Sequence, residues 1–425
     1  MAFIPRFLRF DGYKTIDIRD NHTDKTIEIH LVRRDDKEFT CCRCSSPLQC
    51  KTGHYRLKVR EMPIMDFVVH IVFWRWTGKC LKCKKSRSEA VDFISKETPH
   101  MTKDFSWWLG KLCEIAAVSN AADFADVSKM TAWRVDLKRM LLMLKHYKIP
   151  KVKRISVDEV YARKKKKKGE TRNRRFFTVI TDLKTHRVIW VSESRDKVAL
   201  DEFFNLIGKE ACKKIEVVAM DQHDPYRASV REHCKQAKIV WDRFHLMKSF
   251  NEVLDTILKE ILENEVNDKE LQRMIRGKYR YIFTKRDTKR TIEERAHLNE
   301  VMKRNEIFVK LELIKERLIQ FFDEPNEADA YLTFYEIGAY ISELKFTYLI
   351  DWWVRLRDQW GTLKNYLSAR VTTALSEGIN NVIKALKRKS FGFKNMTYFR
   401  LKIMQTCGYL NSKFIPSVDY LMEDT

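Results

Sequence analysis

The sequence predicts a multidomain α+β protein, with a small N-terminal β domain, a helical segment, and an α/β core that an all-α insertion interrupts. Three patterns predict this class. Residues 1–98 contain short segments of alternating polarity, residues 150–245 alternate apolar runs with amphipathic stretches, and residues 246–372 have helical periodicity with a single proline. We expect the core to resume in residues 373–425.

Residues 1–98 are predicted to form a zinc-binding β domain with strands at residues 26–32, 55–59 and 68–76. Two C-x-x-C pairs lie 35 residues apart, and two such pairs of thiolates at turns give Zn²⁺ a tetrahedral site. The predicted ligands are Cys41, Cys44, Cys80 and Cys83. The N-terminus has no signal-peptide layout, so we expect a reducing compartment in which cysteines are thiols or metal ligands.

Alternatives to this structural zinc site stay open. The two pairs can be a chance occurrence, or Cys42, Cys50 or His54 can replace one of the four ligands. A redox role for a C-x-x-C pair is disfavoured, because no βαβ pattern surrounds either pair.

Residues 99–149 are predicted to form a helix-turn-helix domain. A helix capped by Thr102 or Ser106 runs to residue 117, a short helix covers residues 121–125, and Ser128 caps a third helix at residues 129–146. The apolar stripe of that third helix is expected to comprise Trp133, Leu137, Met140, Leu141 and Leu144. The residues expected to reach a DNA groove are Lys129, Thr131, Ala132, Trp133 and Arg134. The alternative is a plain helical linker.

Residues 150–245 are predicted to form the first part of the core. Strands are expected at residues 154–160, 175–182 and 187–193, followed by a helix at residues 197–206. A strand at residues 215–221, a helix at residues 225–236 and a strand at residues 238–242 complete the series. Three consecutive strands followed by helix–strand–helix–strand is the order of elements in the RNase H-like fold. The basic run at residues 163–168 is either a solvated hairpin tip or a phosphate contact.

Two predicted core strands end in aspartates, Asp158 and Asp221. Ligands of open α/β sheets bind beyond the carboxyl ends of the strands. If the two strands are neighbours, their carboxylates repel each other unless a cation lies between them. This pattern predicts a divalent metal ion, and Asp224 is a weaker candidate for the second acid.

The insertion, residues 246–372, is predicted to contain helices at residues 250–266, 298–322 and 331–348, with Trp352, Trp353 and Trp360 in its core. A further helix at residues 372–387 has a polar and an apolar face. The predicted polar face comprises Glu377, Asn380, Asn381, Lys384 and Arg388, and the apolar face Leu375, Ile379, Val382, Ile383 and Leu386. Gly378 suggests a close approach by another group at this helix.

The composition predicts a polyanionic partner, because 82 Lys and Arg against 58 Asp and Glu give a formal charge of +24. The absence of any run of 18 apolar residues predicts that no segment spans a membrane. We therefore expect a cytoplasmic, nucleoid-associated protein.

Together these motifs resemble the ISL-three family of insertion-sequence transposases, which combine a zinc ribbon with an Asp-Asp-Glu active site. The resemblance spans nearly the whole chain. Its most specific motifs are Asp242-Arg243-Phe244-His245 and Ser376-Glu377-Gly378-Ile379-Asn380, and the later stretches 384–388 and 391–393 also match. Cys42 and residues 222–224 depart from the usual pattern.

The resemblance implies that Asp158, Asp221 and Glu377 are the catalytic carboxylates and bind Mg²⁺ or Mn²⁺. Accessory roles are implied for Asp242, His245, Asn380 and Lys384. Of these, His245 either positions the scissile phosphate or is an ordinary core histidine, and Lys384 would bind phosphate. Two such ions clamp the attacking and leaving oxygens of an in-line displacement, which suits DNA cleavage followed by strand transfer.

The implied partners are double-stranded terminal inverted repeats and target DNA, bound by a homodimer or higher oligomer. Two alternatives stay open. One is a non-catalytic DNA-binding regulator descended from a transposase, and the other is an RNase H-like nuclease without strand transfer.

Overall fold

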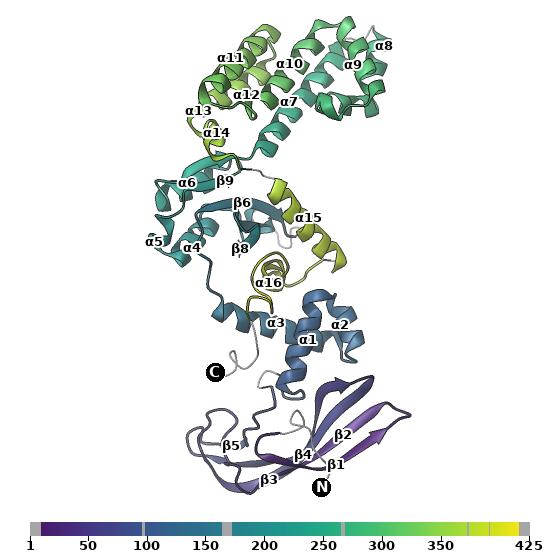
Figure 1. The fold of residues 1–425 in the computed structure, drawn as a ribbon, viewed down its shortest axis with the longest axis vertical. Coiled ribbons are helices and arrows are strands. Elements are labelled where there is room, and N and C mark those ends of the chain that lie inside the picture. The colour runs from purple at the N-terminus through teal and green to yellow at the C-terminus, as the bar shows by residue number, and fades with distance from the viewer. Residues whose placement is uncertain are drawn as a thin grey trace. The chain divides into compact units, whose positions relative to one another are not determined.

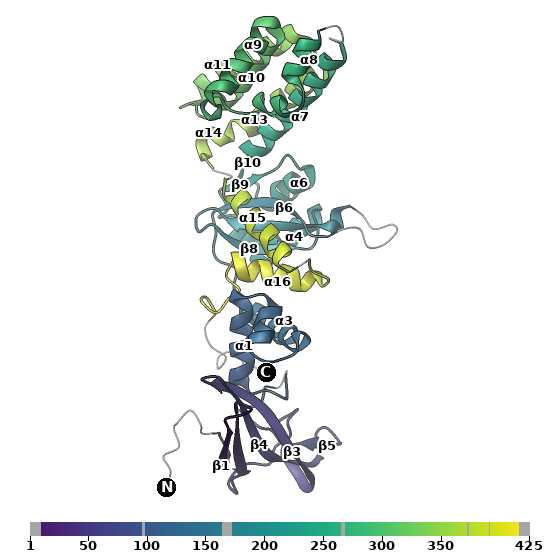
Figure 2. The same ribbon diagram turned by 90° about the vertical axis from the view of Figure 1, so that its right-hand side faces the viewer.

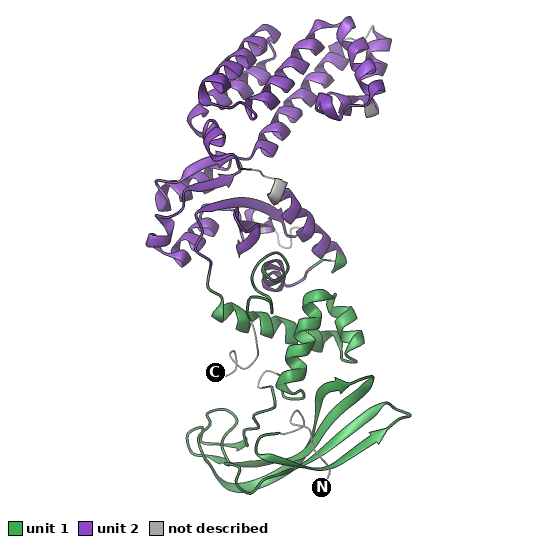
Figure 3. Ribbon diagram, viewed as in Figure 1, with its two compact units in different colours: residues 1–148, 389–392, 404–425 green, residues 149–388, 393–403 purple. Residues whose placement is uncertain are grey.

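The protein has a mixed α/β, multidomain architecture. The computed structural model describes residues 10–95, 98–163, 172–264, 268–371, 374–390 and 392–415. The chain divides into two compact units (Figure 3). The first unit comprises Met1–Lys148, Lys389–Gly392 and Met404–Thr425, and the second comprises Ile149–Arg388 and Phe393–Ile403. Within the described ranges, no helix has the length and apolarity that crossing a membrane requires.

The first unit begins with a five-stranded sheet of order β1-β2-β4-β3, with β5 also paired to β4. Its strands are β1 (Tyr13–Asn21), β2 (Thr26–Arg33), β3 (Leu48–Ile64), β4 (Phe67–Cys80) and β5 (Lys85–Ser88). The strands β3 and β4 are longer than the sequence predicted, because they pair from Leu48 opposite Cys80 to Ile64 opposite Phe67 (Figure 1). One face of the sheet packs on a core of Ile29, Val59, Val69, Ile71 and Phe73.

Three helices follow in the first unit: α1 (Lys103–Ile115), α2 (Val118–Phe124) and α3 (Lys129–His146). The α1 cap is Thr102, whose hydroxyl accepts a hydrogen bond from the Phe105 backbone N–H at 3.2 Å. The α3 cap is Ser128, whose hydroxyl accepts from the Thr131 N–H at 3.1 Å.

The predicted apolar stripe of α3 is confirmed in part, because Met140 is buried and Trp133, Leu137 and Leu144 are partly buried. The buried residues of α3 are Ala132, Val135, Asp136, Arg139, Met140 and Met143, and Leu141 is 40% exposed. The buried face of the helix includes Arg139, whose guanidinium lies against the ring of Trp107 and donates a hydrogen bond to Glu114 at 2.6 Å. A charged residue thus occupies the inner face of the helix, where an apolar periodicity does not identify it.

The second unit contains a five-stranded sheet of order β10-β9-β6-β7-β8. Its strands are β6 (Arg154–Tyr161), β7 (Phe176–Asp182), β8 (Arg187–Ser192), β9 (Val217–Met220) and β10 (Lys238–Trp241). The first three strands are antiparallel neighbours, and β9 and β10 run parallel to β6. The intervening helices are α4 (Lys197–Ile207), α5 (Lys209–Cys212) and α6 (Asp224–His233). The helix α16 (Met396–Cys407) contacts the sheet through Phe399, whose ring lies 5.4 Å from that of Phe177.

The insertion forms a helical bundle of its own (Figures 1 and 2). Its helices are α7 (Arg243–Asn264), α8 (Lys269–Ile275), α9 (Ile292–Arg304), α10 (Glu306–Phe321), α11 (Glu327–Leu344), α12 (Thr347–Arg357), α13 (Trp360–Leu363) and α14 (Asn365–Ala369). Short 3-10 turns at Gly277–Ile282 and Asp287–Lys289 join α8 to α9. As expected, Trp352 and Trp353 are buried, and Trp360 packs against Phe334 at 4.9 Å.

Two predicted helix boundaries in the insertion are wrong. The helix expected at residues 298–322 is two helices, because Asn305 ends α9 and caps α10 by accepting from the Ile307 N–H at 2.9 Å. The helix expected at residues 331–348 ends at Leu344, because Lys345 adopts a left-handed conformation with φ of 56°.

The chain returns to the core through α15 (Ala374–Lys389). Ile379 and Ile383 are buried as predicted, whereas Val382 is 44% exposed. Apart from the backbone of its own helix and its chain neighbours, no described atom lies within 4 Å of the position that a Cβ would take at Gly378, so the expected close approach is absent from this part of the structure. The predicted contacts of the lysine run at residues 164–168 fall outside the described residues.

Candidate metal centres and active site

Three aspartates lie at the same level of three neighbouring strands, with Asp158 inside β6 and the other two directly after the ends of β9 and β10. Val157 pairs with Met220, and Met220 pairs with Trp241, at the last positions of the parallel ladders. The next residue along each strand is an aspartate, and these are Asp158, Asp221 and Asp242. Sheet register therefore brings together acids that lie far apart in the sequence.

The side chains of Asp158, Asp221 and His245 form a cluster whose possible ligand atoms all lie within 4.8 Å of one another. The Nδ1 atom of His245 contacts the Asp221 carboxylate and lies 3.0 Å from Oδ2 of Asp242. The Asp242 side chain also accepts from the Phe244 N–H at 2.7 Å. Buried Asp242 thus caps α7 and orients the histidine in its first turn.

The helix α15 reaches this cluster through Asn380, whose Nδ2 donates to Oδ2 of Asp158 at 2.7 Å. The other oxygen of Asp158 accepts from the Glu159 backbone N–H at 2.7 Å. Glu377 lies one turn before Asn380 and is exposed, and it is not a member of the cluster. Residues at this spacing have Cβ atoms about 5–6 Å apart. Lys384, one turn after Asn380, is also exposed.

The electrostatics of the cluster favour a cation. Burial, followed by the charge of Asp221, raises the pKa of Asp158 to about 6. Burial alone would lower the pKa of His245, but hydrogen bonds and charge from Asp221 and Asp242 outweigh it and raise this pKa to about 10. The shift of the His245 pKa favours a positively charged ring beside the carboxylates.

The weaker candidate for the second acid does not lie at this cluster. Asp224 is the first residue of α6, its side chain is 83% exposed, and it pairs with Arg227 at 2.7 Å. Asp221 is the acid that lies beside Asp158.

Sequence reasoning missed an ion pair on the opposite face of β6. Consecutive strand residues point to opposite faces, so Glu159 points away from Asp158. Its carboxylate accepts from Arg195 at 2.8 Å, and the Arg195 guanidinium stacks on Phe176 at 4.4 Å. Two consecutive acids in a predicted strand, Asp158 and Glu159, were the signal that could have revealed this ion pair. Because they point to opposite faces of the sheet, one of them needs a positively charged partner on the face away from the cluster.

The four predicted cysteines form one cluster in the first unit. The Sγ atom of Cys44 lies 3.5 Å from the Sγ atom of Cys80 and 3.5 Å from that of Cys83. The Sγ atoms of Cys41 and Cys83 are 3.9 Å apart. A tetrahedral Zn²⁺ with Zn–S bonds of about 2.3 Å separates its sulfurs by about 3.8 Å. The donor set therefore fits zinc. The other candidates, Cys42, Cys50 and His54, are not part of the cluster.

Each of the two cysteine turns contains one residue in a left-handed conformation. The residues that follow the second cysteine of each pair, Ser45 and Lys84, both adopt left-handed conformations, with φ of 55° and 52°.

Hydrogen bonds from Ser46 lower the pKa of Cys44 to about 6, whereas neighbouring thiols raise the pKa of Cys83 to about 12. Sulfurs this close compete for protons, and a cation would relieve that competition.

The predicted DNA-contacting residues of α3 differ in accessibility. Lys129 and Arg134 are exposed, and Thr131 and Trp133 are partly buried. Ala132 is fully buried, so its predicted contact with DNA is wrong. It packs with the core residues of α1 and α2 instead.

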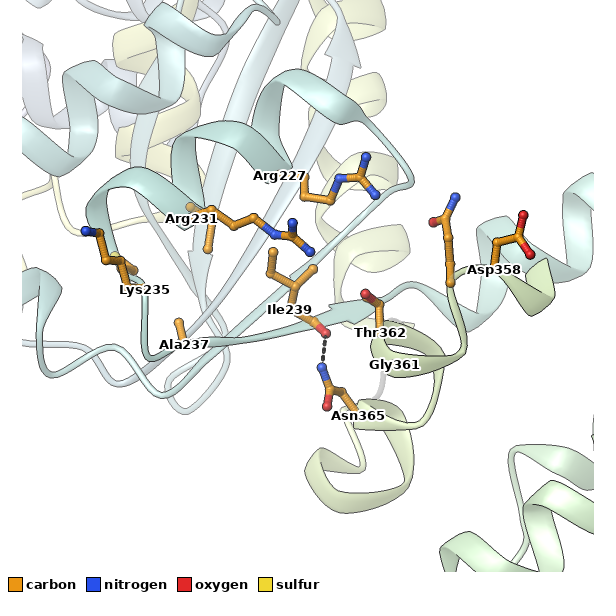
Figure 4. Close-up of a pocket in the computed structure, with 12 residues that line it drawn as sticks. Arg227, Arg231, Lys235, Ala237, Ile239, Asp358, Gly361, Thr362 and Asn365 are labelled. Atoms are coloured by element: carbon orange, nitrogen blue, oxygen red, sulfur yellow. Dashed lines mark hydrogen bonds between the residues drawn. The ribbon is translucent and has the colours of Figure 1, made fainter. Parts of the chain in front are cut away.

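A separate cleft of about 360 Å³ lies between α6 and the end of the insertion (Figure 4). Arg227, Arg231 and Lys235 line one side of it, and Thr362 lies on the other side. Asn365 donates to the Ile239 carbonyl at 2.9 Å, so the insertion covers the edge strand β10. None of the lining residues belongs to the carboxylate cluster.

Comparison with known proteins adds an independent line of information. Residues 155–403 match the model of a family described as transposase, of the ISL-three type. The chain is 23% identical over 385 residues to the transposase for insertion sequence element IS1001 of Bordetella parapertussis, covering 89% of this chain and 91% of that protein. It is also 23% identical over 265 residues to the transposase for insertion sequence element IS1557 of Mycobacterium tuberculosis (strains CDC 1551 / Oshkosh and ATCC 25618 / H37Rv), covering 57% of each chain.

Proposed function

Since the chain belongs to the ISL-three family of insertion-sequence transposases, we propose that it binds the terminal inverted repeats of its element and catalyses metal-dependent DNA cleavage and strand transfer. The observation that carries this proposal is the convergence of Asp158 and Asp221 at one sheet edge, with Asn380 of α15 bonded to Asp158. The strand order β10-β9-β6-β7-β8 supports an RNase H-like core.

The proposed catalytic carboxylates are Asp158, Asp221 and Glu377. The paired aspartates suit Mg²⁺ or Mn²⁺, since hard cations prefer carboxylate oxygens and a cation removes their mutual repulsion. When bound, the ions would activate the attacking hydroxyl and stabilise the leaving oxygen. Glu377 is exposed one turn from Asn380, which leaves its side chain free to turn toward the cluster.

The accessory residues have distinct proposed tasks. Asn380 fixes the rotamer of Asp158 by donating to one carboxylate oxygen. Asp242 holds His245 through the Nδ1 atom, so the Nε2 atom of the ring would donate a hydrogen bond to the scissile phosphate. Lys384 lies further along the same exposed side of α15 and would contact a phosphate of the bound DNA.

The first unit supplies the proposed recognition of double-stranded DNA. Lys129, Thr131 and Arg134 occupy the first turns of α3 and retain exposed surface, and Trp133 is partly exposed beside them. A structural Zn²⁺ on the four cysteines would stabilise the adjoining sheet. Two element ends must be cut together, so we propose that a homodimer or higher oligomer assembles on DNA. The formal charge of +24 suits this partner.

The test is a cleavage and strand-transfer assay on DNA carrying one element end. Asp158→Asn, Asp221→Asn and Glu377→Gln should each abolish both products with Mg²⁺, because each removes one charged ligand while keeping its shape. Binding of the end in a gel-shift assay should persist. Asp224→Asn is the matched control, since this acid is exposed and lies outside the cluster, and it should cut normally. Near-normal cleavage by Asp158→Asn would refute the proposed site.

A further inference from the structure

One face of the sheet in the first unit carries exposed aromatic and basic side chains. The register pairs His54 with Trp76, Arg56 with Trp74 and Lys58 with Val72. Directly paired residues share a face, so the even-numbered side chains of β3 and β4 gather on one side. The odd-numbered Val59 and Phe73 point into the hydrophobic core. This sheet therefore has one face packed on the hydrophobic core and one face that carries aromatic and basic side chains.

Trp74 is the conspicuous residue of that outer face. Its side chain is 52% exposed, whereas the other nine tryptophans of the chain are buried or partly buried. Exposing half of an aromatic ring forgoes much of the stabilisation that its burial would supply. Stability of the domain therefore does not account for a tryptophan at this position.

Basic side chains surround the tryptophan. The ring of His54 lies 4.9 Å from that of Trp74 and 4.7 Å from that of Trp76, and Nζ of Lys51 lies 4.7 Å from the Trp76 ring. Arg56 is exposed directly across from Trp74. Among the described residues, no carboxylate forms an ion pair within 4 Å with Lys51 or Arg56, although the charge of Arg56 also acts on Glu28, which pairs with Lys58 at 2.8 Å. The surroundings of Trp74 are thus positively charged.

We infer that this face, defined by Lys51, His54, Arg56, Trp74 and Trp76, binds an unpaired strand of DNA. An exposed aromatic ring among unpaired cations is the combination that holds single strands, in which bases stack on the ring and cations contact phosphates. Trp76 contacts both His54 and Lys51, whereas Trp74 contacts the His54 ring and is still 52% exposed, so Trp74 offers the larger stacking surface. Paired bases inside a duplex are stacked on one another, and a duplex would present only phosphates to this flat face.

The inference goes beyond the proposed function, which assigns double-stranded DNA to the protein, and it does not depend on the carboxylate cluster. It gives the zinc-bearing sheet a ligand of its own. The proposed ligand is single-stranded DNA, such as a strand that is displaced from a duplex or frayed beside a nick.

The test uses fluorescence anisotropy of the zinc-loaded, full-length protein without Mg²⁺, with a labelled 15-nucleotide oligo(dT) and with a labelled duplex of equal length. Trp74→Ala should weaken binding of the single strand about tenfold, because it removes one stacked base. Affinity for the duplex should stay within about twofold, and Trp74→Phe should retain most of the single-strand affinity. Met65→Ala removes a side chain that is 93% exposed at the β3–β4 turn, and it should change neither affinity.

Salt dependence separates stacking from charge. Arg56→Ala should reduce the slope of log affinity against log salt for the single strand by about 0.7, whereas Trp74→Ala should leave that slope unchanged. Zinc content and circular dichroism of each variant should match the wild type. Unchanged single-strand affinity in the correctly folded Trp74→Ala variant would overturn the inference, as would an equal loss for the duplex. The measurement contains no Mg²⁺ and no cleavage step, so failure of the catalytic proposal would leave this result intact.

Discussion

The cysteine cluster of the first unit and the carboxylate cluster of the second hold their possible metal ligands in different ways. Three pairs of sulfurs lie 3.5–3.9 Å apart and all four lie within 4.8 Å of one another, close to the geometry that zinc requires. The carboxylates instead engage protein donors. Asn380 holds Asp158, and His245 lies between Asp221 and Asp242. The four sulfurs of the cysteine cluster thus face one another. The carboxylate oxygens of the second cluster are bonded to protein donors, which a metal ion could replace.

The difference follows from how each site is assembled. Each cysteine pair comes from one tight turn, and the β3–β4 pairing brings the two turns together. The carboxylates come from β6, β9 and β10, and Asn380 comes from a helix more than 130 residues after β10. A site built from short turns suits a permanent structural metal. A site built from separate elements can accept a substrate and release a product.

The largest expected effect is the loss of a cysteine ligand. Cys80→Ser should abolish zinc binding and unfold the sheet, because structural zinc contributes about 10–16 kcal/mol of apparent binding free energy at neutral pH. Metal analysis should give about one Zn²⁺ per wild-type chain and none for the variant, with a parallel loss of sheet signal in circular dichroism. Cys50→Ser is the matched control, since Cys50 is exposed outside the cluster. A folded wild-type protein without zinc would remove the contrast between the two centres.

A smaller effect is expected from the residue that orients His245. Asp242→Asn should lower the rate of end cleavage about 10- to 100-fold, the usual cost of losing an outer-shell partner. The amide oxygen can still cap α7 at the Phe244 N–H, so the fold should persist. The measurement is single-turnover cleavage at saturating Mg²⁺, with thermal unfolding as the check on folding. Complete loss of cleavage would instead make Asp242 an essential ligand.

Local signals indicated where the two clusters form, but not the predicted third carboxylate, because Glu377 lies outside the carboxylate cluster. The spacing of the cysteines and the apolar runs before Asp158 and Asp221 are short-range patterns, and the clusters form where those patterns indicate. Buried Arg139 escaped prediction, because its charge is satisfied by Glu114 from another helix. The break at Asn305 was hidden inside a continuous apolar periodicity.

The position of α15 also lay beyond local reasoning. Its link to the core is the Asn380–Asp158 hydrogen bond, which joins residues 222 positions apart. An amphipathic pattern gives the two faces of such a helix but not the partner of each face. The exposed state of Val382 and Glu377 depends on that partner.

The smallest expected effect is a gain in the free energy of unfolding, whereas the cysteine substitution should lower it. The pKa of Asp158 is about 6 in the folded protein and 3.8 ordinarily, so the folded state binds more protons between these values and loses stability as pH rises through 6. A neutral side chain avoids this loss. Asp158→Asn should therefore stabilise the metal-free second unit at pH 7 by about 1–2 kcal/mol, less than the full shift implies because the amide has one acceptor oxygen and cannot accept both hydrogen bonds.

Chemical unfolding at pH 4 and pH 7 measures this effect. The gain should disappear at pH 4, where the wild-type carboxyl is protonated in the folded state. Saturating Mg²⁺ should reverse it at pH 7, because the ion stabilises only the protein that binds it. Asp224→Asn should show neither change, since that acid is exposed. Equal destabilisation by Cys80→Ser and Asp158→Asn would mean that both clusters serve the fold, and the carboxylates would then lose their distinction as an exchangeable site.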